Sequence, residues 1–234
     1  MNDVPETKRL LTVYRGYQES NQVRIKWSLS NPGNRAIVKE RNRLLTRLLE
    51  EHGFFPLTRR RILDIGCGGG SILSSFEELG ASPQNLYGID LVPERIYQAN
   101  ERFPEISFQV ANAENLHFKS ASFDLVLLFT VFTSILDMGM ARHISGEISR
   151  VLKPGGAVIW YDFRYNNPNN PHVRAMPRKA IISLFPNFQV ILQTLTLVPP
   201  LSRRLGRLTP ILYPALATIP FLRTHYLGML LKRA

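Results

Sequence analysis

The stretch Leu63-Asp64-Ile65-Gly66-Cys67-Gly68-Gly69-Gly70-Ser71 decides how the rest of this sequence is interpreted. It joins an apolar run that predicts a short buried strand to a segment that predicts a helix from Ser71 to about Gly80. Glycines let the chain turn sharply and let a ligand approach the backbone, because no Cβ intervenes. The helix start offers free N–H groups to an electron-rich ligand. The sequence therefore predicts a ligand-binding strand–turn–helix unit.

A carboxylate at the end of the next predicted strand, Asp90, narrows the ligand to a nucleoside-containing cofactor, because it can accept hydrogen bonds from both ribose hydroxyls. Ser71 stands where a dinucleotide fingerprint has its third glycine, and the lysine of a P-loop is missing. Asp64 would repel a phosphate but suits a cationic amino group. S-adenosylmethionine carries such a group, a ribose and no phosphate, so it is the cofactor that these residues favour.

Strands and helices alternate along the chain. Strands are predicted over residues 61–66, 86–90, 107–111, 123–129, 157–161, 188–198 and 226–232, and helices over 34–53, 71–80, 92–103, 138–152 and 178–185. Asn34 is the expected cap of the first helix, Pro154-Gly155-Gly156 an expected turn, and residues 199–223 two expected short helices. This rhythm predicts an α/β fold with a doubly wound, mostly parallel seven-stranded sheet, an N-terminal helical cap and a C-terminal helical lid insertion.

We predict one domain over residues 1–234. Residues 1–58 form the cap and the first long helix, residues 59–163 the cofactor-binding core, and residues 164–234 the basic, substrate-side part.

Five motifs between Arg61 and Asp162 resemble those of class I S-adenosylmethionine-dependent methyltransferases of the small-molecule "type 11" kind: ILDIGCGGG, YGID, NAENLHF, SFDLVLLF and RVLKPGG. The resemblance implies that Asp64 meets the methionine amino group and that Asp90 holds the ribose. It also implies a Rossmann-like fold and a set of cofactor-binding residues: Asp64, Gly66, Cys67, Gly68, Asp90, Leu91, Asn112, Ala113, Glu114 and Phe129. Asn112 replaces the family's usual aspartate, but its amide oxygen can still accept a hydrogen bond from the adenine amino group.

The positive charge is concentrated in the C-terminal part. Residues 163–234 contain ten Lys and Arg and no Asp or Glu, whereas residues 1–162 contain 19 basic and 18 acidic residues. Such a field attracts phosphates, nucleic acid or an anionic membrane leaflet, although a solvated basic face is an equally good reading.

Several acceptors and mechanisms lack their usual residues. The run after the fourth strand, Phe129 to Phe132, has no Asn/Asp-Pro-Pro-aromatic motif of nucleobase amine methylation. The one cysteine, Cys67, lies in the cofactor loop and is badly placed to attack a pyrimidine. Asp137 and Asp162 are scattered acids, so we expect no metal. The candidate catalytic bases are Asp162, at the end of the fifth strand, and His172, in the loop that follows.

Two flaps are expected to enclose the acceptor. The first contains Tyr14, Tyr17 and Trp27 and would close over the cofactor. The second is the Leu-rich stretch 199–223, which can rest on an anionic membrane or clamp a phosphate-bearing acceptor through its basic residues Arg203, Arg204 and Arg207, beside Leu201, Leu205 and Leu208.

The function these features favour is methyl transfer to a small-molecule, saccharide or lipid-linked acceptor, at an oxygen. Two alternatives stay open: an RNA methyltransferase, which the charge supports but no RNA module does, and a catalytically silent cofactor-binding partner subunit. The start MNDVPETKRL has no signal-peptide pattern, and a single cysteine fits a reducing compartment. We therefore expect a cytoplasmic protein that touches the inner face of a membrane at most peripherally.

Overall fold

The central element of the computed structural model, which describes residues 5–233, is one seven-stranded sheet with the strand order β3-β2-β1-β4-β5-β7-β6. The neighbours from β3 to β5 are parallel, whereas β7 is antiparallel to both β5 and β6. The predicted doubly wound, mostly parallel fold is confirmed. The strands are β1 (Ile62–Ile65), β2 (Leu86–Asp90), β3 (Ser107–Val110), β4 (Phe123–Phe129), β5 (Leu152–Phe163), β6 (Phe188–Leu197) and β7 (Arg223–Lys232).

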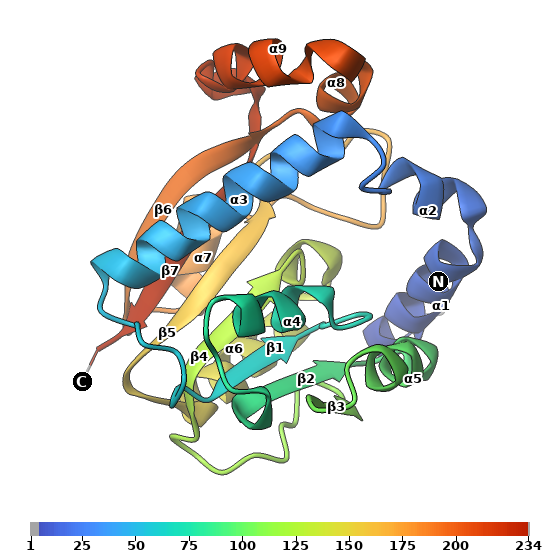
Figure 1. Cartoon of the computed structure of the whole chain (residues 1–234). Coiled ribbons are helices and arrows are strands. Elements are labelled where there is room, and N and C mark those ends of the chain that lie inside the picture. The colour runs from blue at the N-terminus through green and yellow to red at the C-terminus, as the bar shows by residue number, and fades with distance from the viewer. Residues whose placement is uncertain (1–4, 234) are drawn as a thin grey trace.

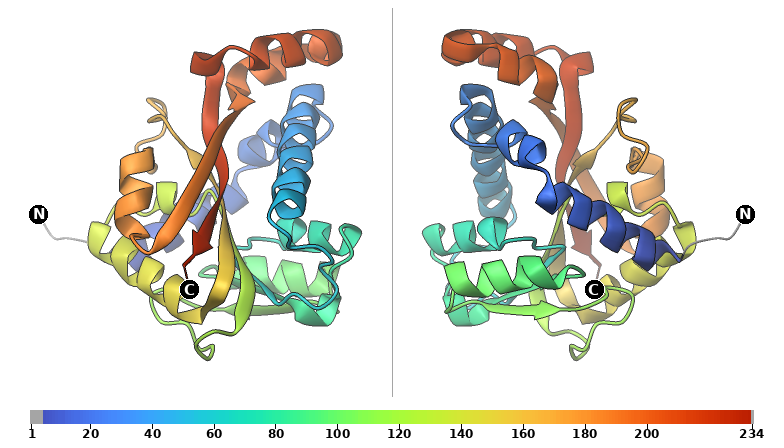
Figure 2. Two further views of the ribbon diagram at one scale, coloured as in Figure 1. Left: turned by 90° about the vertical axis from the view of Figure 1, so that its left-hand side faces the viewer. Right: turned by 90° about the vertical axis from the view of Figure 1, so that its right-hand side faces the viewer.

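Helices cover both faces of the sheet (Figures 1 and 2). One face packs against α3, α4 and α5, and the other against α6 and α7. Alternate residues of β1 show the division, because Ile62 packs on the first face and Leu63 on the second, both without solvent exposure. The α-helices are α1 (Glu6–Glu19), α2 (Asn21–Lys26), α3 (Pro32–Glu51), α4 (Ser71–Glu78), α5 (Pro93–Arg102), α6 (Met138–Val151), α7 (Arg178–Leu184), α8 (Pro199–Arg204) and α9 (Thr209–Ala217), and the 3-10 turns are η1 (Pro83–Asn85), η2 (Phe132–Ser134), η3 (Gly206–Leu208) and η4 (Pro220–Leu222).

The N-terminal region forms two helices where the sequence shows no clear period. Figure 1 places α1 at the ends of β1 and β2, beside α5, whereas α2 leads back to α3. The cap of α3 is Asn31, not the expected Asn34: the Asn31 side chain accepts hydrogen bonds from the N–H groups of Gly33 and Asn34. The amide of Asn34 instead donates to the carbonyls of Lys26 and Ser28 and so fixes the connection from α2.

The predicted turn at Pro154-Gly155-Gly156 is wrong, because these residues lie inside β5. They interrupt the pairing with β4, whose register shifts between Phe123 and Leu125. Gly155 adopts a φ of 72°, which lets the strand bulge and continue.

The second expected flap consists of α8 and α9, inserted between β6 and β7 as predicted and standing beyond the ends of these strands (Figures 1 and 2). We call residues 199–222 the lid. The lid packs on α3 through a small apolar cluster that includes Ile37, Leu197 and Tyr213. Gly33 is required at this contact, because a Cβ there would lie 2.0 Å from the carbonyl oxygen of Ser202.

Candidate functional site

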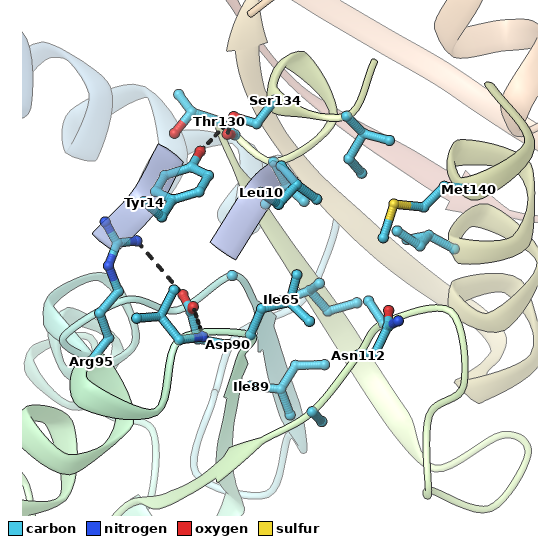
Figure 3. A pocket seen from close by; sticks show the side chains of 18 of the residues that line it. Leu10, Tyr14, Ile65, Ile89, Asp90, Arg95, Asn112, Thr130, Ser134 and Met140 are labelled. Carbon is cyan, nitrogen blue, oxygen red and sulfur yellow. Dashed lines mark hydrogen bonds and ion pairs between the residues drawn. The ribbon is translucent and has the colours of Figure 1, made fainter. Parts of the chain in front are cut away.

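A cavity opens where β1, β2 and β4 end, at the edge of the sheet where open α/β folds bind ligands (Figure 3). Its empty space is about 750 Å³, including the part open to solvent, which is within the range of small-molecule sites. The lining is mostly apolar, with few polar groups. It comprises Leu10, Tyr14, Ile65, Gly66, Ile89, Asp90, Leu91, Val92, Arg95, Ala111, Asn112, Ala113, Phe129, Thr130, Val131, Ser134, Ile135, Met140 and Ile144.

The glycine loop forms one wall. The N–H groups of Gly66 and Cys67 both donate to the carbonyl of Ile89, at 2.8 and 3.0 Å, which ties the loop to β2. Gly66 adopts a φ of 72°, a conformation that glycine alone adopts at little cost. A Cβ at this position would lie 3.1 Å from Cγ2 of Val131, which also lines the cavity. Glycine here keeps both the turn and the space beside it.

Asp90 is the carboxylate that faces the cavity. Its two oxygens accept hydrogen bonds from the N–H groups of Gly68 and Val92, each at 2.9 Å, and Arg95 lies 3.9 Å from Oδ2 (Figure 3). Each carboxylate oxygen has a second lone pair, so both can still accept a hydroxyl of a ribose. Gly68 itself does not line the cavity, but its N–H holds Asp90 in place.

Asp64 lies behind this wall, 1% exposed and outside the cavity lining. Burial raises the pKa of its carboxyl well above the usual range, with the charge of Asp90 adding to this and that of Arg41 opposing it. Its Oδ2 has no hydrogen-bond partner among the described residues. Leaving a buried carboxylate oxygen unpaired costs free energy, so the site lacks a donor that a cationic amino group would supply.

The opposite end of the cavity is suited to a flat apolar group. Leu91 and Ala113 line it, together with Asn112. The amide oxygen of Asn112 accepts the N–H of Glu114 at 2.9 Å, and its amide nitrogen donates to the carboxylate of Glu114. Glu114 does not line the cavity and lies 3.5 Å from His143, so the role assigned to it at the adenine edge stays a prediction.

Six of the predicted cofactor residues therefore share the cavity: Gly66, Asp90, Leu91, Asn112, Ala113 and Phe129. Asp64, Cys67, Gly68 and Glu114 lie outside its lining, and their cofactor contacts stay predictions. Cys67 belongs to the apolar core beneath α4, where burial raises the pKa of its thiol. Its backbone N–H donates to the carbonyl of Ile89, and its thiol donates to the carbonyl of Gly68 within the loop.

Asp162 does not line the cavity either. It is 1% exposed, and its oxygens accept the N–H groups of Thr133 at 2.9 Å and Phe163 at 2.8 Å. Burial raises the pKa of its carboxyl to about 7, although these hydrogen bonds lower it. Because Thr133 adjoins the cavity residue Ser134, the geometry favours a positioning role for Asp162 over contact with substrate.

His172 is exposed in the loop after β5 and lies outside the cavity lining. Its assignment as a base stays a prediction that the geometry does not favour. A second histidine, His225, is buried on β7 and stacked on the ring of Tyr161, with ring centroids 4.8 Å apart. Burial lowers its pKa to about 3, so this imidazole is neutral.

Helix α1 covers the cavity. Leu10 and Tyr14, four residues apart on one face of α1, both line it. The Tyr14 hydroxyl lies 2.5 Å from Oγ of Ser134, and the Arg95 guanidinium lies over the Tyr14 ring at 4.6 Å (Figure 3). The expected flap thus contains Tyr14, but Tyr17 hydrogen-bonds to Asn170 instead and does not line the cavity.

Trp27 is not part of this cover. It is 48% exposed and lies beside Arg203 of the lid, with the guanidinium 5.0 Å from its ring centroid.

Thr130 is a lining residue that the sequence did not indicate. It adopts a φ of 58°, which is unusual for a non-glycine residue, and its N–H donates to the backbone carbonyl of Tyr161. Such strain is typical of a functional site but leaves no signal in sequence periodicity.

The cavity fits S-adenosylmethionine, because it offers an acid for the ribose and an apolar end for the adenine, while the unpaired Oδ2 of Asp64 lies just behind its wall. Within residues 5–233, no group of three His, Cys, Asp or Glu side chains is arranged to hold a metal ion.

Comparison with known proteins agrees with this geometry. Residues 63–160 match the family model described as "Methyltransferase domain". A phthiotriol/phenolphthiotriol dimycocerosates methyltransferase of Mycobacterium leprae is 28% identical over 163 residues, which are 69% of this chain and 56% of that protein. A ubiquinone biosynthesis O-methyltransferase of Azorhizobium caulinodans is 32% identical over 108 residues, 44% of this chain and 40% of that protein. The chain thus spans about half the length of the curated relatives it matches.

Solved structures show the same fold. A geranyl diphosphate C-methyltransferase of Streptomyces coelicolor has a TM-score of 0.60 at 17% identity, covering 81% of this chain and 75% of its own. A SAM-dependent methyltransferase of Methanosarcina mazei has a TM-score of 0.58 at 21% identity, covering 79% of this chain and 97% of its own.

Proposed function

We propose that the chain is a class I S-adenosylmethionine-dependent methyltransferase and that it methylates an oxygen of a small, lipid-type acceptor. The observation that carries the proposal is the cavity at the strand ends, mostly apolar and covered by α1, with hydroxyl groups at one side. A saccharide carried on a lipid fits the same arrangement, provided that its hydroxyl reaches those groups.

The chain's own residues would hold the cofactor in three places. Asp90 would accept the ribose hydroxyls, Asn112 and its apolar neighbours would surround the adenine, and Asp64 would meet the amino group. When bound, S-adenosylmethionine would supply an activated methyl group, which would pass to the acceptor oxygen while the carbon–sulfur electron pair stays on sulfur and the acceptor's proton goes to solvent. The chain therefore needs mainly to align the two reactants.

Alignment is the task we assign to the residues around Ser134. The hydroxyls of Tyr14 and Ser134 are 2.5 Å apart at the cavity and can exchange hydrogen bonds with an acceptor hydroxyl. Asp162 supports this segment from behind through the N–H of Thr133. Helix α1 excludes water above it, which strengthens each of these hydrogen bonds.

Apolar acceptors are supported by two kinds of evidence. The relatives' names include dimycocerosate, ubiquinone and sterol methyltransferases. The lining near the acceptor side, Phe129 and Val131, offers contact to hydrocarbon.

Such acceptors partition into membranes, and we propose that the protein works peripherally at the inner face of one. No helix within the described residues is long and apolar enough to cross a membrane.

The test is transfer of label from methyl-labelled S-adenosylmethionine to a total lipid extract, a saccharide fraction and total RNA, each offered separately. We expect label in the lipid or lipid-linked fraction, in a product that resists mild acid and base as an ether does. The Asp90→Ala variant is the control and is expected to transfer none. Label confined to RNA would contradict the proposal, as would a labelled product with its methyl group on nitrogen or carbon.

A further inference from the structure

The outer surface of the lid carries an unpartnered apolar row. Leu208 is 57% exposed, Ile211 73% and Phe221 72%. They lie on η3, α9 and η4, and α9 contacts both of the other two elements. Figure 1 shows this part of the chain at the top of the molecule, beyond the strand ends and away from the rest of the core. Large apolar side chains exposed to this degree in one segment indicate an interaction surface.

The lid is held firmly from its inner side, so the exposed row does not reflect loose packing. Leu201 and Leu205, which the sequence grouped with the arginines as one amphipathic face, pack inward against the cluster on α3. Tyr213 is buried, and its hydroxyl donates to Glu40 of α3 at 2.8 Å. The apolar face available to a partner is therefore formed by Leu208, Ile211 and Phe221.

Exposed positive charge lies in the same segment as this row. Arg204 and Arg207 are exposed on the lid, and no acidic residue occurs anywhere in residues 163–234. Next to α8, Trp27 lies against Arg203 and is itself 48% exposed. Exposed apolar side chains combined with arginines and an aromatic ring are typical of elements that lie in the interface of an anionic membrane.

We propose that the lid docks on the surface of an anionic phospholipid bilayer, with Leu208, Ile211 and Phe221 in the headgroup–acyl boundary and Arg204 and Arg207 at the lipid phosphates. This inference rests on the proposed function, since a lipid-type acceptor would reach the protein from that bilayer. Nucleic acid offers no apolar contact to match the row. A second copy of the chain would bring the same positive charges face to face.

Flotation with vesicles of equal parts phosphatidylcholine and phosphatidylglycerol tests the proposal. The full chain is expected to float with these vesicles and to stay behind with pure phosphatidylcholine. Ile211→Glu and Phe221→Glu are each expected to weaken binding by about tenfold or more, because each removes one large apolar side chain from the boundary and adds a repelled charge. Arg204→Gln with Arg207→Gln is expected to reduce binding severalfold and to flatten its dependence on salt.

The matched control is Ile182→Glu, which makes the same change at a 43% exposed isoleucine on α7. It is expected to float like the unaltered chain. Binding to neither vesicle, equal loss in the control, or a lid-dependent dimer in sedimentation without flotation would overturn the proposal. Cofactor binding and transfer to detergent-dispersed lipid are measured on the same variants. Methyl transfer that is retained without flotation would contradict the docking surface alone. Flotation without methyl transfer to any lipid would contradict the proposed function.

Discussion

The buried carboxyl of Asp162 makes stability depend on pH, and Asp162→Asn removes that dependence. Burial raises its pKa from the ordinary 3.8 to about 7. With a folded-state pKa above the unfolded one, folding favours the protonated form. This contribution is therefore fully present below pH 3.8 and is lost as the pH rises through about 7. The difference between 3.8 and about 7 corresponds to on the order of 4 kcal/mol of unfolding free energy.

The asparagine variant is neutral at every pH but has one oxygen in place of two. One of the N–H groups of Thr133 and Phe163 then loses its acceptor, which costs about 1–3 kcal/mol. We expect the variant to be less stable than the unaltered protein near pH 4 and more stable above about pH 8. Urea unfolding at a series of pH values measures the free energy of unfolding of both proteins. The contributions of the other titrating groups cancel in the difference between these two free energies.

Asp124→Asn is the control. Burial raises the pKa of Asp124, but the hydrogen bonds from Lys153 and from the Arg61 N–H outweigh it, so the net pKa is lowered. A lowered pKa contributes stability above the ordinary pKa and loses it in acid, so this variant loses most at neutral pH. A difference for Asp162→Asn that stays constant with pH, or that follows the trend of Asp124→Asn, would refute the reasoning.

The remaining predictions concern the cavity. Tyr14→Phe removes the hydrogen bond to Ser134, and for a net bond of about 1 kcal/mol it is expected to weaken cofactor affinity severalfold. Tyr17→Phe on the same helix is expected to leave cofactor affinity unchanged. Equal effects of the two variants in a calorimetric titration would rule out α1 as the cover of the cavity. Gly66→Ala and Gly80→Ala both place alanine at a positive φ and are each expected to cost about 1–2 kcal/mol of stability. Only Gly66→Ala also crowds Val131, so it alone is expected to lower cofactor affinity; an equal drop in both variants would show a purely structural effect.

Local signals were sufficient for the centre of the fold. The strand–turn–helix at Gly66 and the acid Asp90 lie within one short segment of the chain. These consecutive elements also lie next to one another in the structure, where the N–H of Gly68 donates to Asp90. The apolar run Leu125 to Phe129 of β4 similarly predicts a strand buried on both faces, which the structure confirms. The sequence therefore located most of the cavity wall that β1 and β2 provide.

Features that depend on distant contacts were not predictable in the same way. Tyr14 meets Ser134 across 120 positions of the chain, and nothing near Tyr14 indicates that partner. Leu201 and Leu205 turn inward because α3 offers them an apolar surface, which a local pattern of arginines and leucines does not reveal. Pro154 and Gly155 are turn residues by composition, but Leu152 and Ala157 on either side of them both pair with β4, so they form a bulge within one strand.

The central claim is that the cavity beside Gly66 and Asp90 binds S-adenosylmethionine. Isothermal titration of the unaltered chain and of Asp90→Ala, with S-adenosylhomocysteine and with NAD as ligands, tests it most directly. The account predicts one S-adenosylhomocysteine per unaltered chain, none detectable with the variant and no heat from NAD. Equal binding by both chains, or binding of the dinucleotide instead, would contradict it.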